Sequence, residues 1–219
     1  MKTEQKSKGL EVIEGRTYLK AAHLDGKLTF VYPAKGPNTY IEVAGQLKQD
    51  NLSQPTMAQN ASLIHVAWQN PEEKYSKEVI TTLRDSWLWC FNGILYTNEG
   101  TYIQDAPEIK NGRVSMNKED LVKKLEANDS GVRFVPFGYK IGEQSPKELE
   151  KNPFVIALAG EEGAEKLAEI AGNYKLKPCL FSLEKPDQEL IRVASLDEDR
   201  SWDGGRLGVD GDDFDGGRV

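Results

Sequence analysis

Short runs rich in β-branched and aromatic residues open the chain and predict strands. These strands cover residues 10–13, 17–21 and 28–32. Asp25-Gly26, between the last two runs, is typical of a tight hairpin turn. Apolar residues three or four positions apart follow, which is a helical spacing. The helices predicted from it cover residues 39–48, 57–68 and 71–87.

The starts of these helices are marked by capping residues. Thr56 is expected to cap the second helix, and Asn70 to cap the third with Pro71 at its first helical position. The apolar stripe of the third helix includes Val79, Ile80 and Leu83, which we expect to face the core.

Strand and helix patterns alternate irregularly over the second half. Predicted strands cover residues 88–97, 101–103, 114–116, 132–137, 179–183 and 190–194. Predicted helices cover 117–127, capped by Asn117, and 161–174, with two short helices announced by Ser145-Pro146 and Asn152-Pro153. Pro136 places the strand 132–137 at a sheet edge, because proline cannot donate to a ladder. Residues 185–188 are expected to turn the chain between the last two strands.

Hairpins dominate the predicted strand connections, and strict strand–helix–strand alternation is absent. The pattern predicts an α+β fold, with a largely antiparallel sheet built from hairpins, several packed helices and a single core. We expect one α+β domain over residues 1–195. Residues 196–219 form an acidic tail rich in Asp and Gly, expected to pack as a hairpin or turns, or to pair with a sheet edge.

Charge is concentrated in that tail. The chain has 28 basic and 35 acidic residues, a net charge of −7. Residues 197–219 hold eight acidic residues and three arginines, a net charge of −5, so the remaining chain is nearly neutral. This balance argues against a nucleic-acid partner, which requires a basic surface.

The cysteine content and the apolar runs indicate a cytoplasmic protein. Cys90 and Cys179 both sit among large apolar residues, so we expect buried free thiols, with a bridge between them as the alternative. The N-terminal residues lack the apolar stretch of a signal peptide. No apolar run approaches the ~20 residues that span a bilayer, so no membrane partner is expected.

One six-residue unit occurs twice in the tail. Residues 202–207, Trp-Asp-Gly-Gly-Arg-Leu, match residues 214–219, Phe-Asp-Gly-Gly-Arg-Val. We expect Trp202 and Phe214 to pack in equivalent positions, and Arg206 and Arg218 to lie near acidic residues of the tail. The alternative is a calcium site, because Ca²⁺ prefers several oxygen ligands from a flexible loop. Its candidate ligands are Asp210, Asp212, Asp213 and Asp215.

The aromatic residues Trp87, Trp89, Phe91 and Tyr96 cluster near one strand. In a strand Trp89 and Phe91 share one face while Leu88 and Cys90 share the other. A packed core is the first interpretation of this cluster, and a ligand or protein groove is the second.

Linear catalytic motifs are absent from the sequence. It contains no HExxH, Walker A, GxSxG or strand-following GxGxxG pattern, and so predicts no cofactor. We therefore expect a binding or interaction protein without chemistry of its own. The alternative is an enzyme whose site is assembled from scattered residues, for which the candidates are His65, Cys90, Asp105 and Glu108.

Overall fold

A seven-stranded sheet forms the centre of the protein. The computed structural model describes residues 18–201 and 205–213. The strand order is β7-β4-β3-β10-β11-β9-β8, and every neighbouring pair is antiparallel except β11–β9. The strands are β3 (Leu88–Tyr96), β4 (Gly100–Asp105), β7 (Val132–Pro136), β8 (Gly142–Glu143), β9 (Lys177–Phe181), β10 (Leu190–Asp199) and β11 (Arg206–Asp213).

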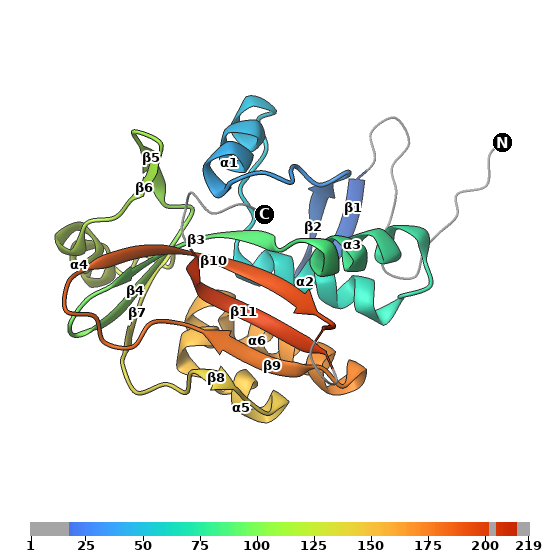
Figure 1. The fold of residues 1–219 in the computed structure, drawn as a ribbon. Helices are drawn as coiled ribbons and strands as arrows, with labels where there is room; N and C mark the ends of the chain where they lie inside the picture. The colour runs from blue at the N-terminus through green and yellow to red at the C-terminus, as the bar shows by residue number, and fades with distance from the viewer. Residues whose placement is uncertain (1–17, 202–204, 214–219) are drawn as a thin grey trace.

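Helices and two small hairpins surround this sheet (Figure 1). The helices are α1 (Tyr40–Gln49), α2 (Met57–Gln69), α3 (Lys74–Asp85), α4 (Lys118–Glu126), α5 (Pro146–Glu150) and α6 (Pro153–Tyr174). The hairpins are β1 (Tyr18–His23) with β2 (Gly26–Val31), and β5 (Glu108–Lys110) with β6 (Arg113–Ser115). The expectation of an α+β fold with a largely antiparallel sheet and a single core is confirmed.

The inner face of the sheet packs against α2 and α6 and carries the main core. Leu207 and Val209 of β11 belong to this core together with Leu167 of α6, and all three side chains are fully buried. On the outer face, Tyr40 and Val43 of α1 pack with Phe91 of β3. We use inner and outer face in this sense below.

The predicted caps and stripe of the helices are largely found. Asn117, Ser145 and Asn152 each accept a hydrogen bond from a backbone N–H of the helix that follows. Thr56 is the N-cap of α2, and Thr39 caps α1 and does not belong to it. Val79, Ile80 and Leu83 face the core, as the spacing predicts. At Gly160 (φ 71°) the backbone of α6 leaves helical geometry, immediately before the predicted helix 161–174.

The predicted start of α3 is wrong. This helix begins at Lys74, with Glu73 as its cap, and ends at Asp85. Asn70 does not cap it, because Asn70 closes α2 instead. Its backbone N–H donates to the carbonyl of Ala67 (3.2 Å) and its side-chain amide donates to the carbonyl of Val66 (3.1 Å). Residues 71–73 then turn the chain into α3.

The predicted pairing of the last strands is also wrong. β9 and β10 do not form a hairpin, because β11 lies between them and pairs antiparallel with β10 and parallel with β9. β11 is therefore an internal strand and does not extend a sheet edge. β10 runs from Leu190 to Asp199, through the expected boundary at residue 195, which stays a prediction. The edge position of β7 is confirmed.

Candidate binding site

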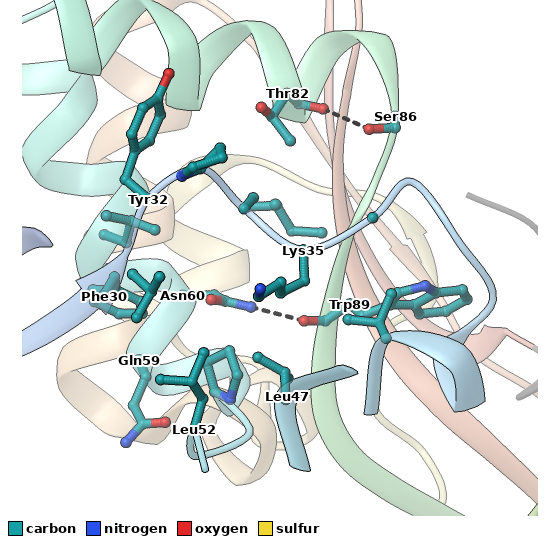
Figure 2. Close-up of a pocket in the computed structure, with 18 of the residues that line it drawn as sticks. Phe30, Tyr32, Lys35, Leu47, Leu52, Gln59, Asn60, Thr82, Ser86 and Trp89 are labelled. Atoms are coloured by element: carbon teal, nitrogen blue, oxygen red, sulfur yellow. Dashed lines mark hydrogen bonds between the residues drawn. The ribbon is translucent and has the colours of Figure 1, made fainter. Parts of the chain in front are cut away.

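A pocket of about 1030 Å³ lies between the β1–β2 hairpin and the start of β3. Its walls come from β2, the loop over residues 32–37, α1, the first turn of α2, α3 and β3. Figure 2 shows Phe30 and Tyr32 on one side of the pocket and Trp89 on the other. These segments are far apart in the sequence, and only the tertiary fold brings them together.

The pocket is lined largely by aromatic and aliphatic side chains. Phe30 and Tyr32 come from the hairpin side, and Trp87, Trp89 and Phe91 come from the start of β3. The rings of Trp87 and Trp89 meet edge to face with centroids 5.8 Å apart. This edge-to-face geometry is one of the preferred arrangements of aromatic pairs, so each ring helps to fix its neighbour.

Hydrogen bonds fix the β3 side of the pocket to α2. The Asn60 side-chain amide donates to the backbone carbonyl of Trp89 (3.0 Å), as Figure 2 shows. The backbone N–H of Phe91 donates to the carbonyl of Pro55 (2.8 Å). The indole N–H of Trp89 donates to the carbonyl of Asn38 (3.0 Å). The floor of the pocket is therefore held in place before any ligand arrives.

The charged residues of the lining differ in their partners. Lys35 forms an ion pair with Asp50, and Lys77 forms one with Glu72. Glu78 and Asp85, both on α3, form no ion pair within the part of the chain that the structure describes. Glu78 Oε2 is buried without a hydrogen-bond donor, and the indole N–H of Trp87 is buried without an acceptor. The lining thus contains two carboxylates, Glu78 and Asp85, without an ion-pair partner among the described residues.

The four residues predicted for a scattered catalytic site have separate partners. His65 Nε2 lies 2.7 Å from Glu169 Oε2, and Asp105 accepts a bidentate ion pair from Arg133 with both distances 2.6 Å. Glu108 is exposed and pairs with Lys110. Cys90 is fully buried in the main core. Over residues 18–201 and 205–213, no hydrogen bond or ion pair joins any two of the four.

The two cysteines are free and buried, which confirms the first interpretation of them and not the bridge. Burial raises the pKa of the Cys90 thiol to about 12, although the hydrogen bond from Asn60 opposes the shift. Burial also raises the pKa of Cys179. Both thiols therefore stay protonated at neutral pH and make poor nucleophiles.

The candidate calcium ligands that the structure describes lie on β11. Asp210 lies opposite Ser195 and points to the outer face, since its neighbour Gly211 faces α6. A register irregularity follows, and Asp213 accepts a hydrogen bond from the Ser195 hydroxyl. Burial, together with Asp212 and Asp213, raises the pKa of Asp210 well above that of an ordinary carboxyl group. No group of three or more metal-ligating side chains is found in residues 18–201 and 205–213. Asp215 lies outside the described residues, and calcium binding stays a prediction.

The repeat in the tail is described only in part. Arg206 lies 3.6 Å from Asp197 Oδ2 and 3.5 Å from Asp199 Oδ2, which confirms that it lies near acidic residues of the tail. Trp202, Phe214 and Arg218 lie outside the described residues, as does the predicted strand 10–13.

The sequence indicates only half of this pocket. Trp89, Phe91 and Tyr96 are buried, which confirms the core interpretation for them, and Trp87, Trp89 and Phe91 also line the pocket. Phe30, Tyr32 and Glu78 were not predicted, because nothing in a single sequence shows that β2 and α3 face β3 across a cavity. The proline-rich loop over residues 32–37 was the one local signal of an irregular wall.

Comparisons with known proteins give a fold and no family. No protein-family model matches the chain, and no curated protein matches it in sequence. A solved structure reported as "Accommodation of massive sequence variation in Nanoarchaeota by the C-type lectin fold" superposes with a TM-score of 0.55 at 13% identity. The match covers 92% of this chain and 94% of that chain, so the similarity extends over the whole fold.

No helix within residues 18–201 and 205–213 is long and apolar enough to cross a membrane.

Proposed function

We propose that this protein is a binding protein that takes a small molecule into the pocket between the β1–β2 hairpin and β3. The observation that carries the proposal is the cavity of about 1030 Å³ with its aromatic lining. Ligand pockets usually measure ~300–1000 Å³ and combine apolar walls with a few placed polar groups. Glu78 and Asp85 are such groups, because both line the pocket and neither forms an ion pair within the described residues.

Two further observations support binding without catalysis. The four candidate catalytic residues have separate partners, and the Cys90 thiol stays protonated because its pKa is about 12. The similar structure is reported as a C-type lectin fold that accommodates massive sequence variation, and we extend that tolerance to the pocket walls of this chain. A cytoplasmic location belongs to the same proposal and is supported by the two free thiols.

The proposal is tested by thermal unfolding in the presence of a chemically diverse small-molecule library. A ligand of the folded state stabilises it by RT ln(1 + c/Kd), where c is the free ligand concentration, so the Tm rises with the logarithm of that concentration. Thr82→Trp places a large side chain in the pocket from α3, and Ala34→Trp does so from the loop over residues 32–37. Lys123→Trp, on the exposed face of α4, is the matched control.

We expect compounds that stabilise the wild type and Lys123→Trp but not the two blocked variants. The second blocked variant keeps the test decisive if the first fails to fold. A library that stabilises none of the proteins, or stabilises the blocked variants as strongly as the wild type, would overturn the proposal.

A further inference from the structure

We infer that the ligand of this pocket is an organic cation with an apolar body, such as an amine attached to an aromatic or aliphatic group. The inference rests on the proposed function and names the chemical class of its ligand. Three features of the lining carry it: the balance of charge, the Glu78 carboxylate without an ion-pair partner among the described residues, and the aromatic walls.

The uncommitted charge of the pocket is negative. Lys35 and Lys77 also line the pocket, and each forms an ion pair with a carboxylate, Asp50 and Glu72 respectively, so each lysine is offset by an acidic residue. Glu78 and Asp85 have no such partner within the described residues. They lie seven positions apart on α3, which places them on the same side of the helix, two turns apart. An arriving ligand therefore meets a wall with two free carboxylates.

Glu78 adds a specific requirement to this general attraction. Its side chain lines the pocket, is partly buried, and forms no ion pair within the described residues. A partly buried carboxylate without a partner is unfavourable, and a donor that carries positive charge compensates it best. A ligand ammonium group beside Glu78 supplies the missing charge.

The aromatic walls suit the same ligand. Tyr32, Trp87 and Trp89 line the pocket together with Glu78, and the faces of such rings attract cations. Their apolar surface would also bury the body of the ligand. An anionic ligand would be repelled by Glu78 and Asp85, and a neutral ligand would leave the charge of Glu78 without a counterion.

Three probes that share one aromatic body separate these cases: phenylpropylammonium, phenylpropanol and phenylpropionate. Their affinities for the full chain are measured by isothermal titration calorimetry. We expect the ammonium compound to bind about tenfold more tightly than the alcohol, and the carboxylate to bind most weakly.

The variant Glu78→Gln removes the charge and keeps the shape of the side chain. It should weaken the binding of phenylpropylammonium about tenfold and leave that of phenylpropanol within about twofold of the wild type. Asp85→Asn should have a smaller effect of the same sign. Glu126→Gln makes the same chemical change on the exposed face of α4, outside the pocket, and should alter no affinity.

The outcomes distinguish this inference from the proposed function. Equal affinities for the three probes, a preference for the alcohol or the carboxylate, or unchanged affinities in both acidic variants would overturn the inference while the pocket keeps its binding role. Failure of all three probes would also overturn it, and the library experiment with Thr82→Trp then decides the proposed function by itself.

Discussion

β3 and β11 are both internal strands on either side of β10, yet their outer faces are opposite in character. β3 is buried on both faces, with Cys90 in the main core and Phe91 against α1. β11 presents Leu207 and Val209 to the core but carries Asp210 on the outer face. A central place in the sheet therefore does not decide composition. α1 packs against the outer face of β3, and that contact requires apolar residues there.

The largest effect should come from emptying the covered outer face of β3. Phe91→Ala removes a ring that is 1% exposed and packs against Tyr40, with centroids 4.7 Å apart. We expect it to lower the free energy of unfolding by about 3–5 kcal/mol, as for other buried aromatic residues. Chemical denaturation measures the change.

Phe181→Ala makes the same change on β9, beside the acidic face of β11, where the ring is only partly buried. It should cost much less, because less apolar surface is lost and solvent fills the space. Equal losses for the two variants would show that the outer faces of β3 and β11 are covered alike, which would remove the contrast.

A second variant examines the inner face of β11, which should be as tightly packed as that of β3. A Cβ atom at Gly211 would lie 2.7 Å from the ring of Phe154 and 3.3 Å from Ile94. Gly211→Ala should therefore lower the free energy of unfolding by about 1–3 kcal/mol through overpacking. Chemical denaturation again measures the change, as a shift of the transition midpoint with an unchanged m-value.

Gly45→Ala is the matched control, because a Cβ atom there meets nothing within 4 Å. Gly45 lies inside α1, where alanine is favoured over glycine by about 0.5–1 kcal/mol, so this variant should be stabilised. If Gly211→Ala were also stabilising, the inner face of β11 would not be closely packed.

On the outer face of β11, replacement of a buried carboxyl group by an amide should stabilise the protein at neutral pH. Burial raises the pKa of Asp210, so the folded state binds a proton more tightly than the unfolded state and the ionised form opposes folding. The free energy of unfolding therefore falls as the pH rises through the raised pKa. Asp210→Asn should raise the stability at pH 7 by about 1 kcal/mol, or about 2–4 °C in Tm, and should not do so below the ordinary carboxyl pKa of about 4.

Asp129→Asn serves as the control for this variant. Asp129 and Asp210 both accept a hydrogen bond from the backbone N–H two residues later, at 2.8 Å and 3.0 Å. Asp129 is exposed, so loss of its charge should leave the Tm unchanged. A rise in Tm for both variants would trace the effect to the turn geometry and not to the burial of Asp210.

The smallest effect concerns the β1–β2 hairpin, which should respond to acid in the opposite sense. Burial, and then the charge of Lys166, lower the pKa of His23. The unfolded state therefore binds the proton more tightly, and stability is lost as the pH falls below about 6.5. Amide hydrogen exchange of β1 and β2 should accelerate between pH 7 and pH 5 after correction for intrinsic rates, and His23→Gln should reduce the acceleration. An unchanged acceleration in His23→Gln would assign the response to another group.

Local patterns predicted most of the elements. The hairpin at Asp25-Gly26, the stripe of Val79, Ile80 and Leu83, and the cap at Asn117 depend on residues within one or two turns of each other, and all are found. The start of α3 was missed because Asn70 and Pro71 fit either the end of one helix or the start of the next. The position of β11 was missed because strand order depends on contacts that are distant in sequence.

The candidate site shows the same division more sharply. The sequence alone determined that residues 87–91 form an aromatic segment and that β3 alternates its side chains between two faces. The acidic residues of β11 are likewise evident from the sequence. Only the tertiary structure decided that β2, α1 and α3 leave a cavity over that segment, and that Glu78 lies in it while Lys35 and Lys77 are already paired. The reason is physical: periodicity follows from the geometry of one element, whereas a cavity and its free charges arise from how several elements fail to fill the space between them.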